Sequence, residues 1–127
     1  MSPVTQKRIL IASNDPTLFK LLSLVLTTEG YQVTQTISGA EAFDKAANLR
    51  PHMVMIDDSL PGVDAPSLCR RLRKNTATHY QAILVLSSKT DVANMIAALE
   101  AGADEYLAKP FDSKELAFRV KNLLVRV

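Results

Sequence analysis

Short, unbroken runs of apolar residues alternate along the chain with longer segments in which apolar residues recur every three or four positions. The unbroken runs occupy residues 9–12, 53–56 and 82–86. Runs of about four to eight apolar residues are typical of strands that are buried on both faces of a parallel sheet. Residues 31–35 alternate between apolar and polar, which predicts a half-exposed edge strand, and residues 105–108 predict a short fifth strand.

The segments that follow the predicted strands have the helical period and predict five helices. The first begins near Pro16, the second follows a capping box at Ser38, and the third covers residues 65–74. The last is capped by Asp112 or Ser113. In four of these helices the positions expected to face the core are Leu18, Leu21, Leu22, Val25, Leu26, Ala42, Phe43, Ala46, Leu49, Leu68, Leu72, Leu116, Val120, Leu123 and Leu124.

The fourth helix, residues 91–101, is apolar on more than one side. Its stripe of larger residues predicts a core-facing side made of Val92, Met95, Ile96 and Leu99. This choice leaves Ala93, Ala97 and Ala98 on an outer face with few charges. In the third helix, by contrast, the cluster Arg70, Arg71, Arg73 and Lys74 predicts a solvated face.

Five strands that alternate with five helices imply a parallel sheet with helices on both faces. We expect an α/β fold of the flavodoxin-like (βα)5 type, an open sheet with strand order 2-1-3-4-5. That order places the three most apolar strands in the centre, as their composition requires. The 127 residues are expected to form one domain, 1–127, with a loose polar tail at 1–7.

The composition gives no support to nucleic-acid binding, membrane insertion or a disulfide-stabilised fold. A net charge of +2 gives no reason to expect direct binding of nucleic acid or of an anionic membrane, and no apolar run is long enough to span a bilayer. The single cysteine, Cys69, cannot form an intramolecular disulfide and is expected to be a small buried residue. These features predict a cytoplasmic globular domain.

Candidate chemistry lies where the predicted strands end. Asp57, Ser87 and Lys109 end the third, fourth and fifth strands, so their side chains are expected to converge at one edge of the sheet. A carboxylate can attack phosphorus and form an acyl phosphate, while a hydroxyl and an ammonium group neutralise the phosphoryl oxygens. Asp58 is expected to point away from this site, because side chains alternate along a strand.

Four stretches together, residues 9–12, 55–64, 86–89 and 102–111, resemble the receiver domain of bacterial two-component response regulators over nearly the whole chain. The resemblance implies a signalling domain and not an enzyme. It implies that Asp57 is the phosphoacceptor, that Ser87 and Tyr106 are switch residues, and that Lys109 meets the phosphoryl group. It also implies a histidine kinase or phosphotransfer protein as partner, Mg²⁺ as cofactor, and commonly a cis bond before Pro110.

One departure from the family concerns the metal. Where the family has two acidic residues after the first strand, this chain has Ser13 and Asn14. The remaining candidate ligands are Asp57, Asn14, Ser59 and Asp15, of which Asp15 fits a helix N-cap better than a ligand. We therefore expect a weak or absent Mg²⁺ site. Asp58 is a further departure, because the family usually has an apolar residue there.

Two alternatives to a phosphorylated receiver remain open. The first is a pseudo-receiver, an interaction domain of the same fold with a defective Mg²⁺ site at Ser13 and Asn14. The second is a phosphatase with an aspartyl nucleophile, although that class carries its Asp-x-Asp motif after the first strand and Asp57 follows the third. A homodimer through the fourth helix, fifth strand and fifth helix is a further expectation, from charges at Asp104, Glu105, Arg119 and Lys121.

Overall fold

The computed structural model describes residues 6–125 of the chain, and these residues form five strands and five helices in strict alternation. The strands are β1 (Arg8–Ala12), β2 (Gln32–Thr36), β3 (Met53–Asp57), β4 (Ala82–Ser87) and β5 (Glu105–Ala108). The helices are α1 (Pro16–Thr28), α2 (Gly39–Leu49), α3 (Ala65–Lys74), α4 (Val92–Ala101) and α5 (Ser113–Leu124). Most of the predicted tail, residues 1–5, lies outside the described range.

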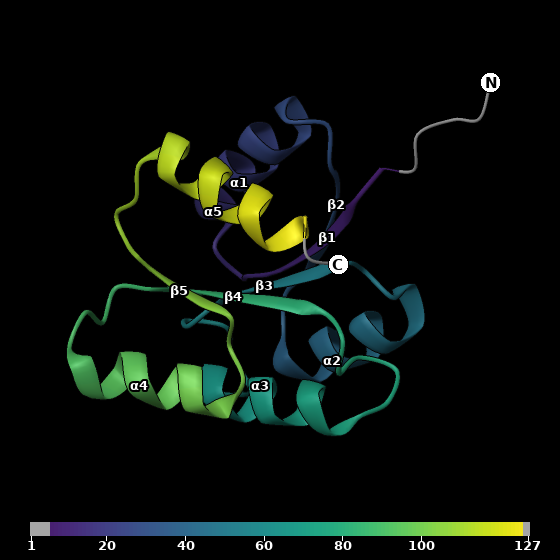
Figure 1. Cartoon of the computed structure of the whole chain (residues 1–127), viewed down its shortest axis with the longest axis vertical. Helices are drawn as coiled ribbons and strands as arrows, with labels where there is room; N and C mark the ends of the chain where they lie inside the picture. The colour runs from purple at the N-terminus through teal and green to yellow at the C-terminus, as the bar shows by residue number, and fades with distance from the viewer. Residues whose placement is uncertain (1–5, 126–127) are drawn as a thin grey trace.

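All strand pairings are parallel, and the order across the sheet is β2-β1-β3-β4-β5. Helices α1 and α5 cover one face, while α2, α3 and α4 cover the other (Figure 1). The predicted flavodoxin-like (βα)5 fold is therefore confirmed. Since every strand runs the same way, the carboxyl ends of all strands lie along one edge, where sheets of this type bind ligands.

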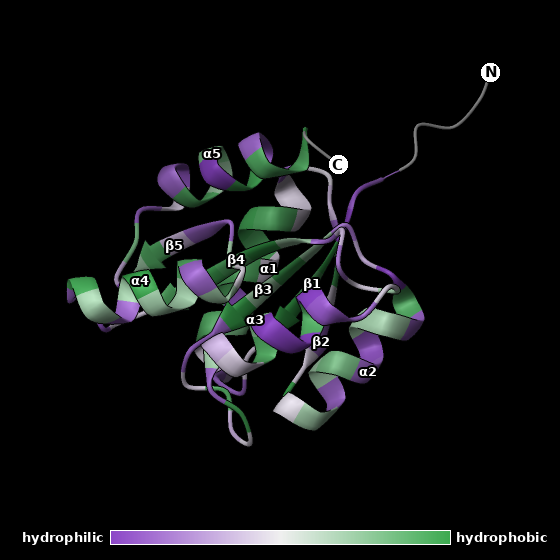
Figure 2. Ribbon diagram, turned by 60° about the horizontal axis from the view of Figure 1, so that its bottom comes forward, coloured by the Kyte–Doolittle hydropathy of each residue, from purple (hydrophilic) through white to green (hydrophobic). Residues whose placement is uncertain are grey.

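The core consists of two layers separated by the sheet. Strands β1, β3 and β4 are buried almost throughout, and the hydropathy colouring shows them as apolar elements enclosed by the helices (Figure 2). Alternate residues serve the two layers: Ile9 and Ile11 pack with α1 and α5, whereas Leu10 packs with α2 and α3. Strand β2 alternates between exposed and less exposed residues, which confirms the predicted edge strand.

The loops at the carboxyl edge of the sheet are fixed by helix caps. Side-chain oxygens at the start of each helix accept hydrogen bonds from backbone N–H groups in the first turn, as helix N-termini require. The capping residues are Asp15, Ser38, Asp64, Asp91 and Asp112. The predicted caps at Ser38 and Asp112 are thus confirmed, and these bonds hold the loops that carry the candidate site.

Helix α4 is rotated from the predicted orientation: Ala98, predicted on the outer face, is buried, whereas Ala93 and Ala97 are exposed as predicted. Its larger apolar residues Val92, Met95, Ile96 and Leu99 are 36–67% exposed, whereas Ala98 and Ala101 are buried. Both sides of α4 are apolar, so the helical period fits either orientation. The side that carries the small alanine side chains packs inward, which allows α4 to lie close to the core. Leu21 and Leu49, also predicted to face inward, are likewise exposed by more than 40%.

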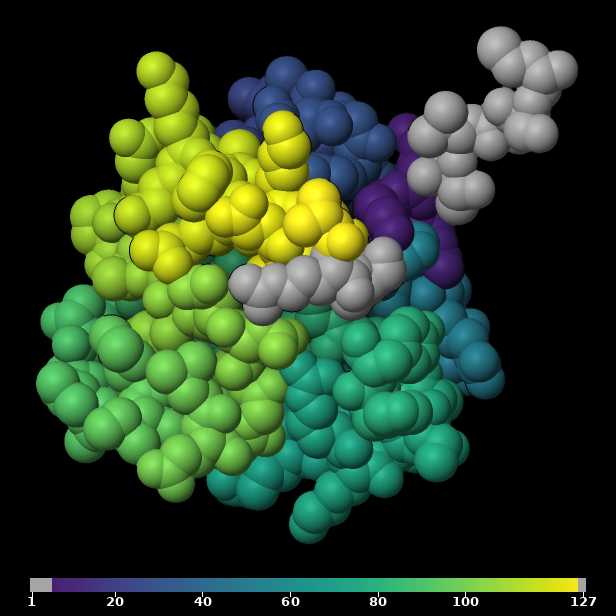
Figure 3. Space-filling model, viewed as in Figure 1, coloured from purple at the N-terminus to yellow at the C-terminus, as the bar shows by residue number. Residues whose placement is uncertain are grey.

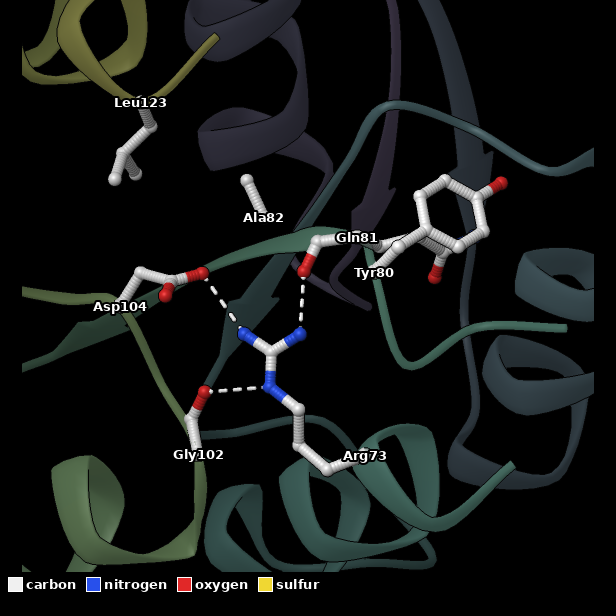
Figure 4. Close-up of a pocket in the computed structure, with 7 residues that line it drawn as sticks. All are labelled: Arg73, Tyr80, Gln81, Ala82, Gly102, Asp104 and Leu123. Carbon is white, nitrogen blue, oxygen red and sulfur yellow. Dashed lines mark hydrogen bonds and ion pairs between the residues drawn. The ribbon is translucent and has the colours of Figure 1, made fainter. Parts of the chain in front are cut away.

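The sequence predicted that Arg73 belongs to a solvated face, and this prediction is wrong. Its guanidinium group lines a pocket of about 230 Å³ and binds several acceptors there (Figure 4). It donates to the carbonyl oxygens of Gly102 at 2.9 Å and Gln81 at 2.6 Å, and to the carboxylate of Asp104 at 2.8 Å. Arg73 therefore connects α3 to the segments where β4 and β5 begin.

Among residues 6–125 no helix has the length and apolar character needed to cross a membrane.

Candidate functional site

The carboxylate of Asp57 is the centre of the site. It lies at the end of β3 and is only 1% exposed. One carboxylate oxygen, Oδ1, accepts a hydrogen bond from Lys109 Nζ at 2.7 Å and another from the backbone N–H of Ser59 at 3.3 Å. The other oxygen, Oδ2, accepts from the hydroxyls of Ser13 and Ser59, each at 2.9 Å. The predicted approach of Asp57 and Lys109 is present.

These contacts keep the site in its charged form. Burial raises the pKa of Asp57, but hydrogen bonds from Lys109, Ser59 and Ser13 outweigh it, so that the pKa is lowered. For Lys109, burial lowers the pKa, and the neighbouring Asp57 and Asp58 carboxylates raise it overall. The site therefore holds an anionic carboxylate next to a cationic amine, a pair suited to nucleophilic attack on a phosphoryl group.

Alternation along the strand predicted that Asp58 points away from the site, but its side chain faces the site. Its Oδ2 accepts a hydrogen bond from Ser87 Oγ at 2.5 Å, and its Oδ1 lies 3.6 Å from Lys109 Nζ. The reason is that β3 ends at Asp57 and the chain turns at Asp58, so alternation no longer applies. Both carboxylates consequently face the same lysine.

The predicted switch residues Ser87 and Tyr106 lie on adjacent strands, and within residues 6–125 neither forms a hydrogen bond with Asp57; Ser87 donates to Asp58 instead. Ser87 Oγ also accepts from the backbone N–H of Lys89 at 3.0 Å, and the Tyr106 hydroxyl donates to the Lys89 carbonyl at 2.5 Å. A pocket of about 180 Å³ adjoins these groups, lined in part by Asp58, Ser87 and Tyr106. The linking role of Lys89 was missed because it uses only backbone atoms, which leave no sequence signal.

The candidate metal ligands are differently engaged. Ser13 is buried, and its hydroxyl donates to Asp57 and accepts from the backbone N–H of Asp15. Asp15 Oδ1 caps α1 through Thr17 N at 3.0 Å and Leu18 N at 3.2 Å. Asn14 is exposed.

Mg²⁺ prefers near-octahedral oxygen ligands and commonly takes one or two carboxylates with waters. Within residues 6–125, no group of three or more Asp, Glu, His or Cys residues is placed to hold a metal ion. Both oxygens of Asp57 already accept hydrogen bonds, from Lys109, Ser59 and Ser13. The residues at the end of β1, neutral Ser13 and Asn14 and the capping Asp15, therefore do not supply the carboxylates of a strong Mg²⁺ site.

Comparison with known proteins decides the family. The family model of the response regulator receiver domain matches residues 9–121. The chain belongs to the receiver domain family of response regulators. This assignment confirms the resemblance seen in the sequence, and it places the chain in two-component signal transduction and outside the classical enzymes. The aspartyl phosphatase alternative is accordingly set aside.

Relatives of this receiver domain include longer proteins. The chain is 38% identical over 121 residues to the DNA-binding response regulator MtrA of Mycolicibacterium smegmatis, covering 95% of this chain and 52% of that protein. It is 39% identical over 119 residues to the DNA-binding dual master transcriptional regulator RpaA of Synechocystis, covering 94% and 49%. The chain thus spans about half the length of these curated relatives.

Solved structures agree with the receiver fold. A putative response regulator from Chloroflexus aurantiacus matches with a TM-score of 0.90 and 40% identity, covering 95% of this chain and 99% of the other. The receiver domain of a sensor histidine kinase from Pseudomonas aeruginosa, described with a magnesium ion in its active site cleft, matches with a TM-score of 0.86 and 27% identity, covering 94% and 98%. The Lys109–Pro110 peptide bond of the present chain is cis, as the resemblance implied.

Proposed function

We propose that Asp57 accepts a phosphoryl group from a phosphohistidine of a histidine kinase or phosphotransfer protein. The observation that supports this most directly is the 2.7 Å contact between Lys109 Nζ and Asp57 Oδ1 at the carboxyl edge of the sheet. An Asp57 oxygen attacks phosphorus, an O–P bond forms, and the N–P bond of the donor breaks with its electron pair returning to the imidazole. Lys109 neutralises charge on the phosphoryl oxygens.

We further propose that residues 1–127 act as one receiver domain in the cytoplasm, without direct contact to membrane or nucleic acid. The small net charge and the free, buried Cys69 support this assignment. Ser87 and Tyr106 are the proposed switch residues, since both contact Lys89 in the loop before α4. Phosphorylation would reach a partner surface through that loop.

Replacement of Asp57 tests the acceptor. Asp57→Asn is expected to abolish covalent phosphorylation, because an amide oxygen is a much poorer nucleophile than a carboxylate. Asp58→Asn is the matched control and should still be labelled. The measurement is intact mass after incubation with acetyl phosphate and Mg²⁺, and then with a phosphorylated histidine donor. Labelling that survives in Asp57→Asn would contradict the assignment.

A second candidate, the pseudo-receiver, is favoured by the position of Ser13. Its buried hydroxyl binds Asp57 Oδ2, at a place where the family carries metal-binding acids. A domain of this kind would bind its partner without being phosphorylated. The same mass measurement separates the two, since a pseudo-receiver remains unlabelled in the wild-type chain even with a phosphohistidine donor.

The surface formed by α4, β5 and α5 is the proposed homodimer interface. These elements share one side of the molecule, with β5 between the two helices (Figures 1 and 3). Exposed Val92 and Ile96 supply apolar area on α4. Arg119 of α5 forms an ion pair with Glu105 of β5 at 2.5 Å. Asp104 and Lys121 add charges of both signs.

Arg119→Glu is expected to weaken such a dimer at least about tenfold, because it puts like charges next to Glu105 and Glu115 and disturbs the face. Light scattering with and without a phosphoryl mimic measures the effect. Lys20→Glu on α1 makes the same change in net charge at an exposed position and serves as control. A dimer that Arg119→Glu leaves unchanged would argue against this face.

A further inference from the structure

Asp58 binds two groups that a phosphoryl group on Asp57 would need. Its Oδ2 accepts a hydrogen bond from Ser87 Oγ, with 2.5 Å between the two oxygens, and its Oδ1 lies 3.6 Å from Lys109 Nζ. A phosphoryl oxygen on Asp57 would be neutralised by the same hydroxyl and the same ammonium group. In the unphosphorylated chain one carboxylate therefore already makes both kinds of contact.

These contacts extend from Asp58 to the loop before α4. Ser87 Oγ donates to Asp58 and accepts from Lys89 N–H at 3.0 Å. The carbonyl oxygen of Lys89 accepts a hydrogen bond from the Tyr106 hydroxyl at 2.5 Å. Lys89 lies in the loop before α4, which begins at Val92. A continuous set of hydrogen bonds thus joins the side chain that follows β3 to β5 and to the loop that precedes α4.

We propose that Asp58 is a positioning residue that takes the place of a phosphoryl oxygen at Ser87 and fixes the β4–α4 loop before any phosphorylation occurs. The inference rests on the proposed function only in taking Asp57 as the phosphoacceptor. A serine hydroxyl has one proton to donate, so Ser87 must leave Asp58 before it can bind a phosphoryl oxygen. The loop is therefore already held by an internal anion, and phosphorylation changes it less than it would in a chain with an apolar residue at this position.

The test follows the backbone amide of Lys89 by hydrogen exchange, resolved by NMR, in the 127-residue chain without a phosphoryl donor. Asp58→Leu removes the acceptor at nearly constant side-chain size and is expected to speed exchange at Lys89 about tenfold, the effect of losing a hydrogen bond to a charged group. Asp58→Asn keeps an acceptor oxygen and should lie between the wild type and Asp58→Leu. The amides of Leu18 and Ser67, capped by Asp15 and Asp64, are reference sites that should not change.

A double-mutant cycle with Ser87→Ala distinguishes positioning from a general loss of stability. With Ser87 replaced, Asp58→Leu should have no further effect at Lys89, because the contact that joins them is gone. Exchange at Lys89 that is unchanged by Asp58→Leu, or that speeds equally with and without Ser87, would overturn the proposal. No phosphoryl donor is present, so this outcome does not depend on phosphorylation of Asp57, which the mass measurement tests separately.

Discussion

Replacing Ser13 and Asn14 together by aspartate is expected to tighten Mg²⁺ binding by about a hundredfold and to raise the rate of phosphorylation by acetyl phosphate. Both residues follow β1 at the carboxyl edge of the sheet, and Ser13 already contacts Asp57 Oδ2. Neutral oxygens attract a divalent cation far less than carboxylates at the same distance, and Lys109 opposes a cation further. Two added carboxylates supply the missing negative charge.

Isothermal calorimetry with MgCl₂ and intact mass after acetyl phosphate measure this effect. The control is Asn48→Asp with Asn122→Asp, which lowers the net charge equally at exposed positions near the far ends of α2 and α5. Equal tightening in the control would show a general charge effect. Sub-millimolar Mg²⁺ binding by the unmodified chain would refute the weak site and make Asp15 the ligand to investigate.

Lys109→Ala is expected to lower the free energy of unfolding at pH 7 by about 3 kcal/mol, since it leaves the buried Asp57 carboxylate without its cation. Adding Asp57→Asn should restore most of the loss, because an uncharged side chain at this position does not need a counterion. Urea denaturation of the two single variants and the double variant gives the coupling energy. Lys114→Ala, at an exposed position in α5, is the control.

The free energy of unfolding that Lys109→Ala loses is expected to depend on pH. In the wild type the pKa of Asp57 is below its ordinary value of 3.8, so its stabilisation is present above that pH and disappears as pH falls through the lowered pKa. Without Lys109, burial remains and the pKa rises. The gap between wild type and Lys109→Ala should therefore shrink as the pH is lowered and Asp57 becomes protonated in both. A gap that is constant from pH 7 to acid would exclude the ion pair as its cause.

The fold was predictable because its signal is simple. Three unbroken apolar runs identify the buried central strands, and the alternation at residues 31–35 identifies the edge strand. Since parallel strands all end at one edge, the approach of Asp57 to Lys109 followed from topology alone. The caps at Asp15 and Ser38 were predictable because capping is local in sequence.

The errors arose where local patterns do not decide. Helix α4 is apolar on two sides, so the period cannot tell which side packs inward. The direction of Asp58 depends on whether β3 ends at residue 57 or one residue later. Arg73 is a charged residue in a charged cluster, and only tertiary structure brings the carbonyl groups of Gln81 and Gly102 to it.

The orientation of α4 also affects how firmly that helix is attached. Its buried side chains are Ala98 and Ala101, whereas α5 buries Leu116, Val120, Leu123 and Leu124. Burial of apolar area contributes about 25 cal/mol per Å², so a helix whose fully buried side chains are two alanines is anchored less firmly than one with four large buried side chains. Local unfolding should therefore detach α4 at a lower free energy than α5, and a protein that covers Val92 and Ile96 would protect α4 from proteases and solvent exchange.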